Sequence, residues 1–552
     1  MGSMVSKTEN TWEVEAEKSR KVLRESIPEQ WLLPQDKLPS SDRLNILSVP
    51  EESGLLTRKE LDITESDATH LVEKMGAGEW SAEEVTIAFL KRATIGNQLV
   101  SFTSSINQSN LNNATEFMAE DAISRAKELD AWYAQHKKLM GPLHGVPIST
   151  KEHIWHKGRV ASGGYVAQVD KIVPEDSHLV QLAKNAGAVF HLRTNEPLTL
   201  MTGDCHNNIF GQTLNPCHLK LSCGGSSGGE GASIGFKSAA LGLGTDIGGS
   251  IRIPAAFNGI YGFRPSASRL PYDGIELPGA GQESVKCVIG PLAHSIDDIN
   301  LLMKTILDQE PWDNEVSLVP LPWKKVDVSR KITVGIMWSD GIVHPHPPMN
   351  RVLKSAKEKL QAAGIKVIDW EPYKSMEILQ LIITLFFPDG GKAITDLIAL
   401  TGEPLSTGAA TFLQHARELT VSENWAANAQ RDRLRAEFHS LMKDRGVDVI
   451  LCPPFVGAAP EMNKMDYGTY TMLWNLLDLP ALVFPTGEVV DGRVDVVEEG
   501  YVPVNEIDKA QFERYDPKTF EGAPIGLQVV GKHLRDEETV AAAKLIESIL
   551  KK

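Results

Sequence analysis

The stretch GGSSGGEGA at residues 224–232, followed by GLGTDIGGS at residues 242–250, decides how this chain is interpreted. Each half places a serine, Ser226 or Ser250, in a glycine-rich turn. Glycine tolerates backbone conformations that other residues avoid, so such turns can direct several N–H groups to one point. Lys151 follows an apolar run at residues 146–150, and no histidine stands out as a partner for the serines. The pattern predicts a hydrolase in which a lysine activates a serine.

The residues suggest a role for each member of this site. We assign Ser250 as the candidate nucleophile, Ser226 as a proton relay and Lys151 as the base. A free lysine has a pKa near 10.4, so Lys151 must be buried to act as a neutral base. The developing oxyanion needs hydrogen-bond donors, and we expect them to be the backbone N–H groups of Ile247, Gly248, Gly249 and Ser250.

The spacing alone leaves two other interpretations open. Glycine-rich turns with serines also bind phosphate at helix N-termini, which would make this a non-catalytic nucleotide-binding module, and some glycine turns are purely structural. The pattern GxxxxGK[ST] of the P-loop is absent near these residues. The nucleophile elbow GxSxG is not satisfied around Ser250, because Arg252 stands where its second glycine would be.

Short apolar segments alternate with helical patterns along much of the chain. Apolar strands without alternation, separated by helices, indicate a sheet buried on both faces, so we predict an α/β protein. Residues 1–60 read as an N-terminal helix and extended arm, and residues 61–552 as one domain, since no Pro/Gly/Ser linker divides them. The predicted strands are 146–150, 187–193, 332–337, 365–370, 447–452, 481–484 and 525–530, and the main predicted helices are 12–24, 81–93, 113–136, 178–185, 349–363 and 537–550.

The composition of the chain argues against several classes of binding partner. The net charge of −16 argues against nucleic acid and anionic membranes. Five scattered cysteines without a CxxC favour reduced thiols, and the polar N-terminus and the lack of a long apolar run predict a cytoplasmic protein without a membrane span. The histidine spacing fits no zinc pattern, so we expect no metal.

The motifs also carry a resemblance to a known family. GGSSGG at 224–229, GTDIGGSIRIPAAF at 244–257 and GFRPS at 262–266 are similar to the signature of the amidase signature family. The similarity extends to GPLHGVPISTKE at 141–152, GQTLNP at 211–216 and GAPIGLQVVG at 522–531, with the signature core at about residues 141–270. Within the family the chain most resembles the fungal acetamidase-type general amidases.

The resemblance implies both a fold and a reaction. The expected fold is a large mixed twisted β-sheet covered by helices on both faces. The expected reaction is hydrolysis of a small-molecule carboxamide to a carboxylate and ammonia or an amine, without a cofactor. Ser250 would form an acyl-enzyme, Ser226 would follow a cis peptide bond from Gly225, and Lys151 would be the base.

The resemblance also reaches the substrate pocket and leaves an alternative open. Leu200, with Met201 and Thr202, matches the family segment that edges the acyl pocket. Phe386 and Phe387 are candidates for a substrate channel. An amidotransferase-type glutaminase subunit, which would supply ammonia to a partner, remains the alternative function, and a homodimer is compatible with the sequence.

Overall fold

The computed structural model describes residues 11–40, 42–99, 112–326 and 332–552. Within these residues eleven strands form one mixed sheet in the order β1-β3-β2-β6-β8-β7-β12-β13-β11-β9-β10. Parallel pairing joins β3, β2 and β6 at one side and β11, β9 and β10 at the other, and antiparallel pairs fill the centre. The strands are β1 (Ala114–Phe117), β2 (Pro147–Lys151), β3 (Val189–Thr194), β6 (Leu241–Asp246), β7 (Tyr261–Arg264), β8 (Val288–Ala293), β9 (Thr333–Ile336), β10 (Lys366–Asp369), β11 (Val449–Cys452), β12 (Ala481–Val489) and β13 (Pro524–Val530), and a separate hairpin pairs β4 (His206–Asn207) with β5 (Gly211–Gln212).

The central strands are buried on both faces. Every residue of β2, β3, β6 and β8 is buried, although successive side chains of a strand point to opposite faces. Both faces must therefore be covered, which confirms the predicted sheet between layers of helices. The strand β2, which carries Lys151 at its end, thus lies in the protein interior.

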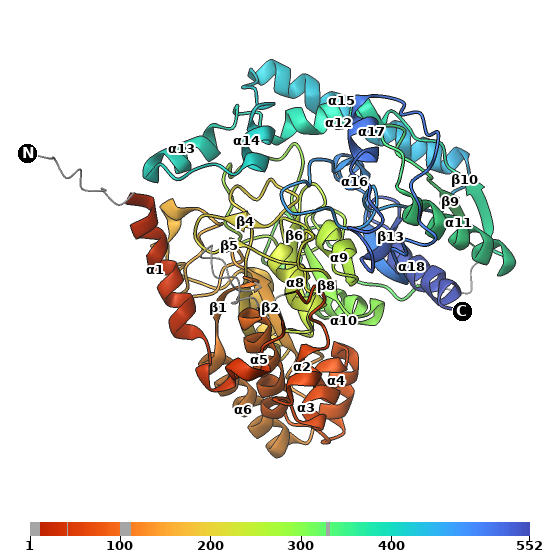
Figure 1. Cartoon of the computed structure of the whole chain (residues 1–552). Coiled ribbons are helices and arrows are strands. Elements are labelled where there is room, and N and C mark those ends of the chain that lie inside the picture. The colour runs from red at the N-terminus through yellow and green to blue at the C-terminus, as the bar shows by residue number, and fades with distance from the viewer. Residues whose placement is uncertain (1–10, 41, 100–111, 327–331) are drawn as a thin grey trace, which may run out of the picture.

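Helices form the covering layers (Figure 1). In this view α12 to α15 lie together at the top of the molecule, and α2 to α6 lie at the bottom. The helices are α1 (Thr11–Ser26), α2 (Val49–Ser53), α3 (Arg58–Glu65), α4 (Ala68–Gly76), α5 (Ala82–Gln98), α6 (Ala119–His136), α7 (His178–Asn185), α8 (Gly228–Gly235), α9 (Arg252–Phe257), α10 (Ile296–Leu307), α11 (Pro347–Ala362), α12 (Ser375–Phe386), α13 (Lys392–Thr401), α14 (Thr407–Leu413), α15 (Val421–Asp444), α16 (Thr469–Leu477), α17 (Glu506–Phe512) and α18 (Asp536–Leu550).

Local sequence explains several helix starts. Ser81 caps α5 by accepting from the N–H of Glu84, whose carboxylate accepts from the N–H of Ser81 in return. This capping box satisfies donors that a helix N-terminus otherwise leaves unpaired, and it starts the helix that the sequence predicted at residues 81–93. The same motif starts α3 at Thr57 and α15 at Thr420.

One predicted helix is wrong at its start. Residues 113–136 were expected to form one helix, but Ala114–Phe117 is the strand β1 and the helix α6 begins at Ala119. β1 pairs antiparallel with β3 and all four of its residues are buried. Pairing with the edge of a sheet therefore overrides the local helical pattern, as it often does for short segments.

The N-terminal arm packs on the β1 side of the sheet. In α1 the Arg20 side chain donates to the carbonyl oxygens of Asn208 and Ile209, and Leu23 packs with the buried Phe117 and Leu192. The division of the chain near residue 60 stays a prediction. Among the helices that the structure describes, none is both long and apolar enough to cross a membrane.

Candidate active site

The two serine turns are bonded to each other. The N–H of Ser227 donates to the carbonyl oxygen of Ser250 at 3.0 Å. The Ser227 hydroxyl donates to the Thr245 carbonyl at 3.3 Å and accepts from the Thr245 N–H at 3.2 Å. The peptide bond between Gly225 and Ser226 is cis. A Cβ atom at Gly225 would lie 2.7 Å from the Thr202 carbonyl oxygen, so this turn requires a glycine.

Glu230 fixes the helix that follows Ser226. Its carboxyl group, fully buried in the first turn of α8, accepts from the Ser149 hydroxyl of β2 and from the Thr194 hydroxyl of β3, both at 2.6 Å. Burial raises the pKa of Glu230 to about 8, against these hydrogen bonds and the charge of Lys151. Because β2 also carries Lys151, Glu230 holds the Ser226 turn against the strand that supplies the lysine.

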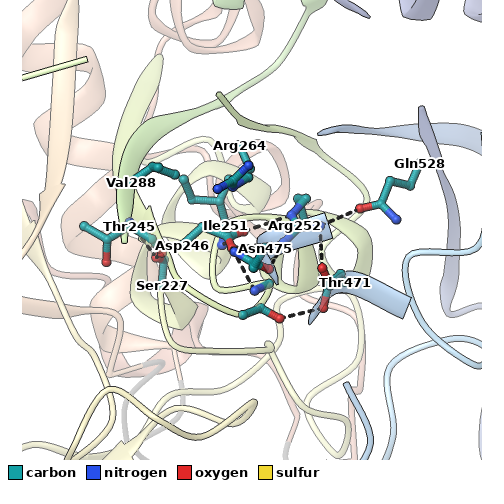
Figure 2. A network of polar contacts seen from close by, with 12 residues as sticks. Ser227, Thr245, Asp246, Ile251, Arg252, Arg264, Val288, Thr471, Asn475 and Gln528 are labelled. Carbon is teal, nitrogen blue, oxygen red and sulfur yellow. Dashed lines mark hydrogen bonds and ion pairs between the residues drawn. The ribbon is translucent and has the colours of Figure 1, made fainter. Parts of the chain in front are cut away.

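An ion pair holds the Ser250 turn (Figure 2). The Asp246 carboxylate accepts from the N–H groups of Gly249 at 2.8 Å and Ile251 at 3.1 Å, and from the Arg252 guanidinium at 3.0 Å. Burial opposes ionisation of Asp246, but the Arg252 charge and hydrogen bonds keep its pKa below the ordinary value. The remaining Arg252 hydrogen bonds reach α16 and β13, at Thr471, Asn475 and Gln528.

Lys151 lies beside Ser226 in the protein interior. Its Nζ atom is 2.7 Å from the Ser226 hydroxyl oxygen and 3.1 Å from that of Thr245. Lys151 is fully buried, and burial lowers the pKa of its amine, against the opposing influence of Glu196 and more distant acidic groups. Burial of this kind favours the uncharged amine, which can accept a proton from the adjacent hydroxyl.

A cavity of about 850 Å³ opens onto both serines. Ser226, Ser250 and Thr245 line it together with Leu200, Met201, Ile247, Phe386 and Phe387. Thr202, the third residue of the predicted pocket segment, is not among the lining residues. Thr199 and Leu200 have φ values of 75° and 60°, and left-handed backbone at residues other than glycine is often found at functional sites.

The predicted oxyanion donors are not equivalent. The N–H of Gly249 donates to Asp246 and is therefore engaged. The N–H groups of Ile247, Gly248 and Ser250 make no hydrogen bond within the part of the chain that the structure describes. These three groups lie at the turn that ends β6, where Ile247 and Ser250 line the cavity.

The sequence interpretation missed three residues next to Lys151. Thr245 bonds to Lys151, His153 bonds to Thr245, and Glu196 lies beyond His153. Thr245 could have been found, because it directly precedes Asp246 in the quoted motif. It lies near the end of β6, and β6 pairs in parallel with β2, which ends at Lys151. His153 and Glu196 carry no spacing signal, since their proximity depends on the pairing of β2 with β3.

Comparisons with known proteins give the family of the chain. A family model described as Amidase matches residues 100–540. The chain is 37% identical to an acetamidase of Aspergillus oryzae, over 98% of this chain and 99% of that protein, and 38% identical to an acetamidase of Emericella nidulans, over 98% of each. A solved structure titled "Fatty acid amide hydrolase" is similar with a TM-score of 0.92 and 37% identity, covering 98% of this chain and 95% of that chain.

These findings decide the family. The family model covers well over half of the chain, and the fungal relatives match it almost from end to end. None of the three relatives described here is named as an amidotransferase subunit. The chain belongs to the amidase signature family and is a hydrolase of amides.

Proposed function

We propose that the chain hydrolyses carboxamides through an acyl-enzyme on Ser250, with Ser226 and Lys151 as the proton path. The observation that supports this most directly is the buried Lys151 amine at 2.7 Å from the Ser226 hydroxyl. Both serines line one cavity, and the free N–H groups of Ile247, Gly248 and Ser250 lie at the same turn. Nucleophile, base and oxyanion donors are thus available at one place.

The proton path balances in each half of the reaction. The Ser226 proton passes to neutral Lys151, the Ser250 proton passes to Ser226, and the Ser250 oxygen attacks the carbonyl carbon. The oxyanion accepts from the free N–H groups until the C–N bond breaks. The leaving nitrogen then takes a proton from Ser226, which regains one from Lys151. Water attacks the ester by the same path and releases the carboxylic acid, so Ser250 is regenerated.

The cavity favours substrates with a bulky apolar part. Its volume of about 850 Å³ is within the range for sites that bind drug-sized ligands, so a two-carbon acyl group would leave most of it empty. Leucine, isoleucine, valine and phenylalanine side chains supply much of the wall, among them Leu270, Ile275, Leu277, Val285, Phe386 and Ile394. We therefore place the preferred substrate among amides of longer aliphatic or aryl acids, although relatives of this chain are named acetamidases.

A series of primary amides tests this substrate class. The leaving group stays ammonia while the acyl chain grows from two to about ten carbons, and kcat/KM is measured for each. Burying a methylene contributes about 0.8 kcal/mol, so kcat/KM should rise about fourfold per added carbon until the cavity is full. Highest activity on acetamide, with a decline as the chain grows, would contradict the substrate class while leaving amide hydrolysis intact.

A matched pair of variants locates the acyl chain. Ala393 on α13 lines the cavity, whereas the exposed Ala399 on the same helix does not. Ala393→Phe should reduce kcat/KM for the long amides and leave acetamide turnover near its original value. Ala399→Phe should change neither. A cytoplasmic location, a homodimer and independence from cofactors stay predictions.

A further inference from the structure

A line of buried polar groups continues from Lys151 through Thr245, which lines the cavity, to His153 and Glu196. The Thr245 hydroxyl oxygen lies 3.1 Å from Lys151 Nζ and also 3.1 Å from His153 Nε2. On the other side of the imidazole ring, His153 Nδ1 lies 3.6 Å from Glu196 Oε2. The line therefore runs from β6 through the residues just after β2 and β3, and joins the proposed base to a buried carboxyl group.

At the far end of this line, polar atoms of two neighbouring side chains lack hydrogen-bond partners. Glu196 is 1% exposed and His153 is 0% exposed. Neither carboxyl oxygen of Glu196, nor His153 Nδ1, makes a hydrogen bond to a residue that the structure describes. A buried polar atom left without a partner costs about 1–3 kcal/mol, so two such neighbours call for an explanation. His153 Nδ1 and Glu196 Oε2 lie within 4 Å of each other, and the Glu152 carboxyl group is a second neighbour of Glu196.

The tautomer of His153 decides what Lys151 can do. Burial lowers the pKa of His153 well below its ordinary value, and Lys151 and Arg193 lower it further, so the ring is neutral. A neutral imidazole has one donor and one acceptor nitrogen. With the hydrogen on Nδ1, Nε2 accepts from the Thr245 hydroxyl, whose oxygen then accepts from the Lys151 amine.

The other tautomer would disturb the base. With the hydrogen on Nε2, the ring donates to Thr245, and the Thr245 hydroxyl hydrogen is free to turn to the Lys151 lone pair. That lone pair is the one that must accept the Ser226 proton. An acceptor beside Nδ1 selects the productive tautomer, and a carboxyl group offers an acceptor oxygen in either protonation state.

We propose that Glu196 acts as a positioning residue that fixes the Nδ1–H tautomer of His153, and through Thr245 keeps the Lys151 lone pair directed at Ser226. This inference rests on the proposed function, in which Lys151 accepts that proton. The distance of 3.6 Å is longer than a hydrogen bond, and contacts of this kind often shorten when substrate binds. A closer approach would satisfy both unpartnered groups.

The other titratable groups around this line do not take the place of Glu196 as the acceptor for His153 Nδ1. The Glu152 carboxylate accepts from the N–H groups of Ser162 and Gly163 and lies 3.8 Å from Arg193. Burial raises the pKa of Glu196 well above its ordinary value, and Glu152 adds to this. The remaining groups that influence Lys151 or Glu196 are Cys205, Cys287 and Asp246.

Four variants and one matched control test the proposal. Glu196→Leu removes the acceptor, whereas Glu196→Gln keeps an acceptor oxygen in nearly the same place. Thr245→Val breaks the line, and Thr245→Ser preserves its hydroxyl. The control is Thr150→Val, which removes a second buried Thr–His bond, from Thr150 to His156 at 2.9 Å. Thr150 precedes Lys151 on β2, but the hydrogen bonds of Lys151 Nζ go to Ser226 and Thr245 and not to the Thr150 hydroxyl. Each variant is measured for kcat, KM and the pH dependence of kcat/KM on a primary amide.

The expected outcome separates positioning from simple damage. Glu196→Leu and Thr245→Val should lower kcat by about 100-fold, the lower end of what proton transfer contributes, with little change in KM. The acid limb of kcat/KM against pH should move to lower pH in these two variants, because the protonated form of Lys151 is then stabilised less. Glu196→Gln, Thr245→Ser and Thr150→Val should stay within a few fold of the unaltered protein.

Two results would overturn the proposal. One is a folded Glu196→Leu variant with full kcat and an unmoved acid limb. The other is an equal loss in Glu196→Gln and Glu196→Leu, which would indicate a role for the charge instead of the acceptor. Failure of the proposed function is a separate result, since it would appear as undiminished turnover in Ser250→Ala whatever Glu196 does.

Discussion

The amine of Lys151 and the hydroxyl of Ser226 lie 2.7 Å apart at a place that both side chains reach from different layers. Lys151 comes from the end of β2 and Ser226 from the turn before α8. Glu230 bonds that helix to the strand, so the two groups are held in register. This relationship supports the proposed role of Lys151 as a base, because burial disfavours the charge of an ordinarily cationic side chain.

Replacing Lys151 should affect amides more than esters. In Lys151→Ala the relay loses both the base and the acid for the leaving nitrogen, so amide kcat/KM should fall on the order of 10⁴-fold. An alkoxide leaves with less help from an acid, so the matching ester should lose less. Parallel assays of an amide and an ester of the same acid measure this, and equal losses would count against Lys151 as the leaving-group acid.

Activity should increase with pH across the range in which Lys151 loses its proton. The neutral amine is the active form, so protonation at lower pH removes activity. Burial lowers the pKa of Lys151, which places this acid limb below the value near 10.4 of a free lysine. A pH profile of kcat/KM on a neutral amide measures the limb. An inflection near 10.4, or activity that falls as pH rises through the limb, would contradict the assignment.

Arg252 should be required for stability. In Arg252→Met the buried Asp246 carboxylate loses its ion pair, and breaking a buried pair in this way costs about 3–5 kcal/mol. Urea unfolding followed by tryptophan fluorescence measures the change. Lys392→Met is the control, because the Lys392–Asp396 pair is exposed and such pairs contribute up to about 1 kcal/mol. Equal stability of the two variants would show that the Asp246–Arg252 pair does not hold the turn.

Gly249 should tolerate no side chain. Its φ is +131°, and an added Cβ would lie 2.2 Å from the Thr471 hydroxyl oxygen. Gly249→Ala should displace the neighbouring N–H groups, each of which can contribute about 10²–10³-fold to kcat as an oxyanion donor. Gly446→Ala provides the control, since Gly446 also has a positive φ but has no atom within 4 Å of the added Cβ. Steady-state kinetics of both folded variants would settle the comparison, and unchanged kcat in Gly249→Ala would refute it.

The sequence predicted most strands of the sheet but missed β1 at its edge and the three adjacent strands β6, β8 and β7 in its centre. The predicted bounds of apolar strands such as β9, β11 and β13 lie within one or two residues of the observed bounds. These strands are recognisable because buried strands are rich in apolar residues. β6 was missed, since Gly242 and Gly244 lower its apparent strand propensity. Gly242 is required there for another reason: a Cβ would lie 2.0 Å from Glu230 Oε2.

The site shows the same division between local and distant information. The motif placed Ser226, Ser250 and Lys151 at one site, as the quoted family pattern implies. It could not show that the Gly249 N–H is occupied by Asp246, which depends on the turn geometry. It also could not reveal Glu196 beside His153, because two residues separated by 43 positions meet only after β2 and β3 pair.

The most direct test of the central claim is the site of covalent labelling by a fluorophosphonate probe, mapped by mass spectrometry on the intact protein and its peptides. We expect one probe on Ser250, much slower labelling in Lys151→Ala, and no labelling at this position in Ser250→Ala. Attachment to a different residue, or labelling at the original rate after Lys151 is removed, would contradict activation of Ser250 by the buried lysine.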